Sequence, residues 1–171
     1  FEEPIQNDPK YFDADIGKKI NQYNQKIRGI MEMPIGSSDT KIQKAIEENR
    51  DANLQESPLG NLVTDILRKN CATEMVFLNS GALRGKLEKG VLTNEAIFRC
   101  LPFNDNIFVS EMEGYIVESA LETAASSRYG LLQVSGLTYS VDPKKPEGQR
   151  VQNIQVQGED LNRGRKYSVA F

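Results

Sequence analysis

The residues best suited to bind a small ligand follow a short apolar segment, in the stretch FLNSGALR at 77–84. A strand that ends in Asn-x-Gly places backbone N–H groups and a side-chain amide at the rim of a sheet, where ligands commonly bind. The amide of Asn79 offers a donor and an acceptor, and the guanidinium of Arg84 can hold phosphate oxygens through two parallel charge-assisted hydrogen bonds. The alternative is that Asn79 and Gly81 only shape a turn and that Arg84 is an exposed charge.

A large aromatic side chain follows Pro102, the residue expected to stop a helix, in the stretch LPFNDN. Phe103 is therefore either a core anchor or a partly exposed ring. Phe98 and Phe108 lie nearby, and we expect both in the core because they fall within regular apolar patterns.

The sequence contains no histidine. Histidine is the commonest transition-metal ligand and the usual general base near neutral pH. Histidine-based zinc sites, Ser-His-Asp triads and Cys-His dyads are therefore excluded. A dinuclear metallohydrolase site, which typically mixes histidine with carboxylates, cannot be built from this chain alone. We expect neither a metal site nor a catalytic residue here.

The two cysteines, Cys71 and Cys100, fit no metal-site spacing. They are either two buried thiols or one disulfide, which would stabilise the fold by roughly 3–4 kcal/mol on the chain-entropy estimate. We favour the thiols, because two cysteines are too few to indicate an oxidising compartment.

The composition fits one ordinary domain of 171 residues, with 39% apolar and 26% charged side chains. The net charge of −3 argues against a nucleic-acid polymer as partner, whereas one or two arginines suffice to bind a small anion. The sequence shows no signal peptide and no transmembrane segment. The chain begins at Phe1 without Met and ends at Phe171 inside an apparent strand, so we expect both ends to be fragment boundaries.

The first long element is a predicted helix over 13–31, after a loose lead-in at 1–12. Asp13 is its expected cap, and Pro34 ends the run. One stripe of this helix is apolar, and we interpret it as a packed surface helix; the stripe consists of Ile16, Ile20, Tyr23, Ile27 and Ile30.

The remaining elements predict an α+β (mixed α/β) fold, with helices packed on a mixed β-sheet. Ser57 and Pro58 give a clear helix start, and a short strand follows at about 75–78. Residues 35–56 are ambiguous between strand and helix. The later stretches predict a short helix (TNEAIFRC), a strand (NIFVSEME), a helix (GYIVESALETAASS) and three strands (LLQVSGLTYSVD, VQNIQVQ and KYSVAF).

Two glycines are interpreted as structural or close to the ligand site. Gly60 lies in the first turn of a helix, where the missing side chain permits close packing. Gly136 and the preceding Ser135 either line the ligand cleft or permit a close backbone approach. The basic residues of the NRGRK turn at 162–166 are interpreted as solvated.

Five short stretches, in order and with similar spacing, resemble the C-terminal domain of the 5′-nucleotidase family, which includes UDP-sugar hydrolases and 2′,3′-cyclic nucleotide phosphodiesterases. The resemblance covers roughly residues 50–171. It implies a lead-in and interdomain linker helix at 1–34 and a substrate-binding domain at 35–171, truncated before its last motif. The stretches are ESPLGNLVTD at 56–65, FLNSGALR at 77–84, LPF at 101–103, LLQVSGLTYSVD at 131–142 and VQNIQVQGEDLNRGRKYSVAF at 151–171.

The resemblance also implies roles for particular residues. Asn79, beside Gly81, matches a family asparagine that contacts the base, and Arg84 matches an arginine near the substrate phosphate. Phe103 matches one ring of an aromatic clamp on the base; the family's second ring and its ribose-binding aspartate lie beyond Phe171. Where the family has a further phosphate-binding arginine, this sequence has Asn53, with Arg50 three residues earlier as the possible substitute.

The resemblance further implies a division of labour between two domains. An N-terminal metallophosphoesterase domain of the same protein would hold two divalent metal ions and the catalytic histidine, while this domain binds the nucleotide or nucleoside. The protein would then be a periplasmic or extracellular phosphohydrolase, and this chain alone would be inactive. The alternatives are a stand-alone nucleoside- or sugar-binding module, a related hydrolase with a non-nucleotide substrate such as a sulfur-oxidation enzyme, and a scaffold with a vestigial cleft.

Overall fold

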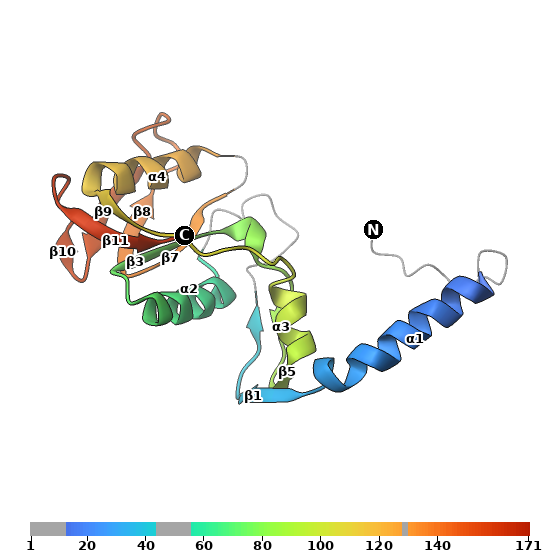
Figure 1. The fold of residues 1–171 in the computed structure, drawn as a ribbon. Coiled ribbons are helices and arrows are strands. Elements are labelled where there is room, and N and C mark those ends of the chain that lie inside the picture. The colour runs from blue at the N-terminus through green and yellow to red at the C-terminus, as the bar shows by residue number, and fades with distance from the viewer. Residues whose placement is uncertain (1–12, 44–55, 128–129) are drawn as a thin grey trace.

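A four-stranded sheet with the order β6-β11-β3-β7 forms the centre of the fold (Figure 1). The computed structural model describes residues 13–43, 56–127 and 130–171. β11 runs parallel to β3, whereas the two edge strands pair antiparallel, so the predicted mixed sheet is confirmed. The four strands are β3 (Met75–Asn79), β6 (Val109–Glu113), β7 (Leu132–Ser135) and β11 (Lys166–Ala170).

Two helices lie on opposite sides of this sheet (Figure 1). α2 (Pro58–Cys71) packs on β3 and β7, and α4 (Gly114–Ser126) packs on β6 and on the neighbouring strand β9 (Val151–Val156). The predicted start of α2 is confirmed, because the Ser57 hydroxyl accepts a hydrogen bond from the N–H of Gly60 at 2.8 Å. The main core lies between the sheet, α4 and β9; its buried residues include Met75, Phe77, Val117, Leu121 and Val169.

The stretch predicted as one strand at 131–142 is two strands in different sheets. β7 ends at Ser135, and β8 (Leu137–Val141) pairs with β9 in a three-stranded sheet that also contains β10 (Glu159–Asp160). The break falls at Gly136, which has a φ of +86°. An alternating apolar pattern continues through both strands, so the pattern alone does not reveal where the chain changes sheet.

The described residues contain two further, short strand pairs, which the sequence left ambiguous or unassigned because strands of two to five residues leave little periodicity. β1 (Pro34–Ser38) pairs with β5 (Gly90–Thr93), and β2 (Ile42–Gln43) pairs with β4 (Lys86–Leu87). β2 resolves part of the ambiguous segment at 35–56 as strand.

A second core lies beside α3 (Asn94–Cys100) and contains Leu59, Leu83, Leu87 and Cys100. Cys71 and Cys100 are free thiols, so no disulfide joins them. Cys100 is buried, and burial raises the pKa of its thiol, whereas Cys71 is only partly buried.

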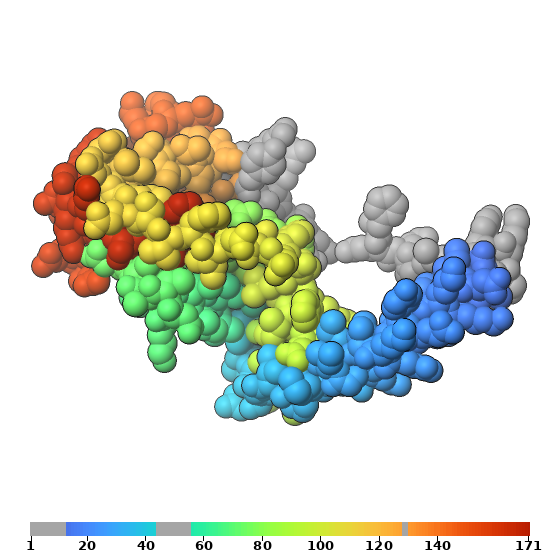
Figure 2. Space-filling view, viewed as in Figure 1, coloured from blue at the N-terminus to red at the C-terminus, as the bar shows by residue number. Residues whose placement is uncertain are grey.

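α1 (Ala14–Met31) projects from the rest of the molecule as an arm, coloured blue in Figure 2. Its predicted cap is confirmed, because Asp13 Oδ1 accepts hydrogen bonds from the N–H groups of Asp15 and Ile16. The interpretation as a packed helix is wrong for this chain: α1 has no buried residue, and its apolar stripe is exposed. Contacts with the body are at its C-terminal end, where Asn94 Nδ2 donates to the Ile30 carbonyl at 2.9 Å.

The expectation that Phe98 and Phe108 lie in the core is also wrong. Their exposed fractions are 56% and 62%. Phe98 belongs to a helix of only two turns and lines a hollow between that helix and α1. Phe108 precedes β6 and stacks on Phe171, with ring centroids 6.2 Å apart. An apolar pattern in such short elements does not decide which side faces the core.

Replacing Gly136 with alanine should destabilise the fold by about 2–4 kcal/mol, from backbone strain and overpacking together. A Cβ there would lie 1.9 Å from the Glu74 carbonyl oxygen, which is backbone and cannot rotate away. Gly158→Ala is the matched control: its φ is +87° and nothing lies within 4 Å of the added carbon, so it should lose only about 1 kcal/mol. Urea unfolding of the two variants measures the difference, and equal losses would contradict the steric argument.

Candidate functional site

A turn of 3-10 helix, η3 (Ser80–Ala82), follows β3; it contains Gly81 and lies between two other predicted ligand residues, Asn79 and Arg84. Ser80 and Ala82 are buried, and Leu83 N–H donates to the Ser80 carbonyl at 3.3 Å to close the turn. Asn79 is exposed at the end of β3, and its side chain makes no capping hydrogen bond to η3. The polar amide is therefore at the rim of the sheet, as the sequence predicts.

Arg84 folds back over this turn. Its Nη1 donates to the carbonyl oxygens of Gly81 and, at 2.8 Å, of Leu83. Its Cζ lies 5.2 Å from the centre of the Phe103 ring, within the range of a cation–π contact. The guanidinium is therefore ordered by two carbonyls and one aromatic ring.

Phe103 reaches Arg84 because the end of α3 is tied to the turn. Arg84 N–H donates to the Cys100 carbonyl at 2.9 Å, and the chain continues from Cys100 through Leu101 and Pro102 to the ring. The Phe103 side chain is 51% exposed, so it is a partly exposed ring and not a core anchor.

Four of the five predicted ligand residues therefore lie around one turn. Asn79 lies against Gly81, where an added Cβ would come within 3.2 Å of the Asn79 amide nitrogen. Arg84 bonds to Gly81 and contacts Phe103. The fifth, Arg50, lies outside the described residues. An amide, a cation and an exposed ring in this arrangement could bind a ligand that has a polar aromatic part and an anionic part.

The sequence analysis did not identify a buried polar side chain behind the turn, Gln133 of β7. Its Oε1 accepts from Ser57 N–H at 3.0 Å, and its Nε2 donates to Ser80 Oγ at 3.1 Å. The available signal was a glutamine between apolar neighbours in a strand. Gly60 is structural as predicted, because a Cβ there would lie 2.1 Å from Gln133 Oε1.

Gly136 and Ser135 also have structural explanations. Gly136 permits the close approach to Glu74 described above, and Ser135 is buried, with its Oγ donating to Asp65 Oδ1 at 2.5 Å. The NRGRK turn was predicted to be only solvated, and this is incomplete, because its basic side chains form exposed ion pairs. These are Arg163–Glu118, Arg165–Glu74 and Lys166–Glu111.

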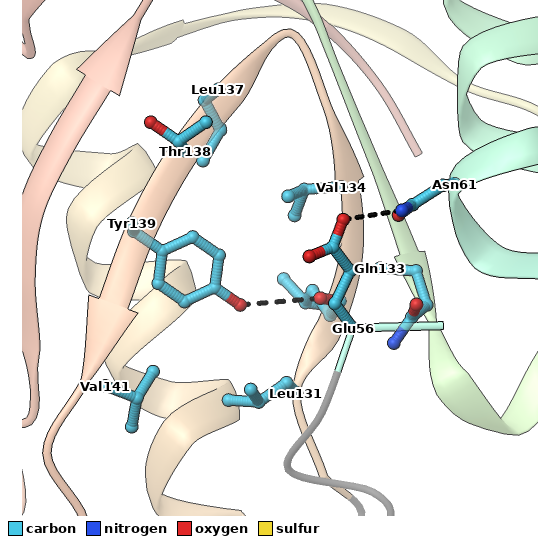
Figure 3. A pocket seen from close by; sticks show the side chains of 10 residues that line it. Glu56, Asn61, Leu131, Gln133, Val134, Leu137, Thr138, Tyr139 and Val141 are labelled. Carbon is cyan, nitrogen blue, oxygen red and sulfur yellow. Dashed lines mark hydrogen bonds between the residues drawn. The ribbon is translucent and has the colours of Figure 1, made fainter. Parts of the chain in front are cut away.

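A separate cavity of about 310 Å³ lies between β7, β8 and the start of α2 (Figure 3). Tyr139 O–H points into it and donates to the Leu132 carbonyl at 3.4 Å, while Asn61 Nδ2 donates to Glu56 Oε1 at 2.5 Å. Burial, with a smaller effect of the Glu56 charge, raises the pKa of Tyr139 to about 12. The four predicted ligand residues around η3 lie outside the lining of this cavity.

Two kinds of site are absent from residues 13–43, 56–127 and 130–171. Within those ranges, no group of three or more His, Cys, Asp or Glu side chains could hold a metal ion. No helix there combines the length and apolarity needed to cross a membrane.

Solved structures with this fold include nucleotide hydrolases. A 5′-nucleotidase precursor from Thermus thermophilus has a TM-score of 0.77 and 28% identity, over 90% of this chain and 32% of that one. The sulfate thiohydrolase SoxB of Thermus thermophilus has a TM-score of 0.78 and 21% identity, over 95% of this chain and 31% of that one, and shows similarity of fold alone. The fold is thus that of a domain found within larger hydrolases.

The family is settled by sequence. The family model for the 5′-nucleotidase C-terminal domain matches residues 34–171, and the chain belongs to this family. An apyrase of Aedes albopictus is 27% identical over 184 residues, which cover 98% of this chain and 31% of the apyrase. The chain spans from 10% to 33% of the length of the relatives that it matches. The resemblance and the α+β fold class are both confirmed.

The raised pKa of Tyr139 predicts a specific alkaline effect. In the unfolded chain this phenol ionises near its ordinary pKa of about 10, whereas the folded protein keeps the proton until pH is about 12. Its contribution to stability is therefore complete below pH 10 and lost as the pH rises from 10 to 12. The difference between the alkaline absorbance titrations of the wild type and Tyr139→Phe should have a midpoint near 12, and a midpoint near 10 would show that the phenol is not buried.

Proposed function

We propose that this chain is the nucleotide-binding half of a 5′-nucleotidase-type phosphohydrolase. The observation that carries the proposal is the contact between Arg84 and the exposed ring of Phe103, with Asn79 on the same turn. A nucleotide joins an aromatic base to a phosphate, and this turn offers a group suited to each. Membership of the family, whose relatives include an apyrase and a 5′-nucleotidase by name, supports the same substrate class.

In the proposed complex, the base stacks on Phe103 and its edge pairs with the Asn79 amide. Arg84 exchanges the carbonyls of Gly81 and Leu83 for the phosphate oxygens. Gly81 leaves room for the ligand and for the Asn79 side chain. Arg50 remains a proposed second phosphate ligand.

The partner that hydrolyses the ester would be an N-terminal metallophosphoesterase domain holding two divalent metal ions. Two observations support it: the matched region makes up a third or less of these relatives, and the stripe of α1 is apolar yet exposed. We place the linker at 1–34 and the binding domain at 35–171, and we infer a periplasmic or extracellular protein from the family. A hydrolase of this fold with a non-nucleotide substrate would have no evident use for the exposed Phe103 ring.

The site can be tested by titrating the 171-residue chain with adenosine and with AMP while following amide NMR shifts. Arg84→Ala should weaken AMP binding by about 10- to 100-fold, since hydrogen bonds to charged groups contribute about 1.5–3 kcal/mol. The same variant should leave adenosine binding nearly unchanged. Phe103→Ala should weaken both ligands, because stacking on a base contributes about 1–3 kcal/mol.

Arg99→Ala is the matched control for charge. Arg99 is exposed and pairs with Glu95 on α3, and its side chain takes no part in the contacts of Arg84 and Phe103 described above, so its removal should change neither affinity. Shifts that fall outside Asn79, Arg84 and Phe103, or an equal loss from Arg99→Ala, would refute the assigned site.

The separation of binding from hydrolysis gives an independent test. The purified chain, supplied with Mn²⁺, Zn²⁺ or Mg²⁺, should leave AMP and UDP-glucose intact in a phosphate-release assay, because it has no histidine with which to build the metal site. Turnover that co-purifies with the chain and is lost in Arg84→Ala would refute the proposed division between the domains.

A further inference from the structure

Gln133 is a polar side chain in the interior, with both ends of its amide bonded to separate parts of the chain. It is 4% exposed, and it lies on β7 between α2 and η3. Its acceptor oxygen is bonded to Ser57 N–H, in the N-cap of α2, and its donor nitrogen is bonded to the Ser80 hydroxyl. A buried amide with both ends satisfied fixes the distance between its partners.

The Ser80 hydroxyl connects Gln133 to η3, because Ser80 is the first residue of that turn. It accepts from Gln133 and donates to the Leu131 carbonyl at 2.6 Å, so its donor and acceptor roles are both used. Ser80 lies directly between Asn79 and Gly81. Asn79 itself pairs with Leu132 in the sheet, so the backbone before the turn is already set by β7.

Packing leaves Gln133 little freedom to adopt another position. Gly60 of α2 lies so close that an added Cβ would be within 2.7 Å of three Gln133 side-chain atoms. Thr64 on the next turn of α2 is fully buried, and its hydroxyl lies 3.2 Å from the Val134 carbonyl and 2.9 Å from the Gly60 carbonyl, so it contacts β7 independently of Gln133. The amide is therefore enclosed by α2 on one side and by η3 on the other.

We propose that Gln133 is a positioning residue: through Ser80 it holds η3 in the conformation that presents Asn79 and Arg84 to the ligand. The ligand part of this inference rests on the proposed function, whereas the structural part concerns only the turn. Gln133 itself is buried and does not touch the ligand.

The test compares Gln133→Met, which keeps the length of the side chain but removes donor and acceptor, with Thr64→Val, which removes a different polar contact between α2 and β7. Both variants should melt at a lower temperature than the wild type. Gln133→Met alone should speed hydrogen exchange of the Leu83 amide, which closes η3, by about tenfold relative to the amides of β11. It alone should also weaken AMP binding by about tenfold.

Ser80→Ala removes the same hydrogen bond from the other partner, and it replaces Gln133→Met in the test if that variant does not fold. It should reproduce both effects, and combining it with Gln133→Met should add nothing further. If Leu83 exchange and AMP affinity in both variants match those of Thr64→Val, the positioning role is wrong. If the wild type does not bind AMP, the proposed function fails, and Leu83 exchange alone still decides whether Gln133 holds the turn.

Discussion

Hydrogen bonds between α2 and β7 set the position of η3, and the candidate site around it depends on them. The side chains of β7 that face α2 include Gln133 and Ser135, whereas its apolar residues Leu132 and Val134 are only partly buried. The Thr64 hydroxyl contacts the Val134 carbonyl. Ser135 Oγ accepts a hydrogen bond from Arg68 Nε at 2.8 Å and donates one to Asp65. Leaving one such buried group unsatisfied costs about 1–3 kcal/mol, so this contact has one favourable register. An apolar contact would tolerate sliding more readily.

This fixed register explains why two distant stretches of sequence meet at one turn. β7 pairs with β3 up to Asn79, and the Gln133 amide then holds the first residue of η3. The N–H of Arg84 is bonded to the end of α3, which brings Phe103 alongside. The ring and the guanidinium are thus placed by main-chain hydrogen bonds, and their exposed ends remain available.

Much of the fold was predictable, because long elements carry their own signals. The caps Asp13 and Ser57 and the strand before Asn79 were identified from residue type and spacing. The break between β7 and β8 at Gly136 was not predicted. The alternation of apolar and polar residues continues on both sides of it, and only the close contact with the Glu74 carbonyl requires a glycine. Likewise, the apolar stripe of α1 predicts burial, but the stripe is exposed in this chain. An apolar stripe indicates that the helix packs on another surface, and it does not indicate whether that surface belongs to the same chain.

The site was predictable to a different degree. Motif spacing identified Asn79, Arg84 and Phe103, whereas Gln133 gave only the weak signal of a polar residue in a strand, and its importance depends on partners 53 and 76 residues away. Hydrogen bonds between such distant residues follow from the way the strands pair, and no local pattern encodes that pairing. The sequence therefore predicted the groups of the proposed ligand site better than the buried group that we propose holds them.

The contact between Arg84 and Phe103 has a further consequence for the proposed complex. A cation over an aromatic ring at a partly exposed site contributes about 0.5–1 kcal/mol, less than the 1.5–3 kcal/mol or so of a hydrogen bond to a charged group. Hydrogen bonds to the phosphate replace those that Arg84 donates to the Gly81 and Leu83 carbonyls, so the loss of the ring contact itself costs little. Until then the contact keeps the long arginine side chain near its working position, which reduces the conformational entropy lost on binding. In the proposed complex, occupation of the phosphate position and exposure of the ring to the base are thus coupled by one side chain.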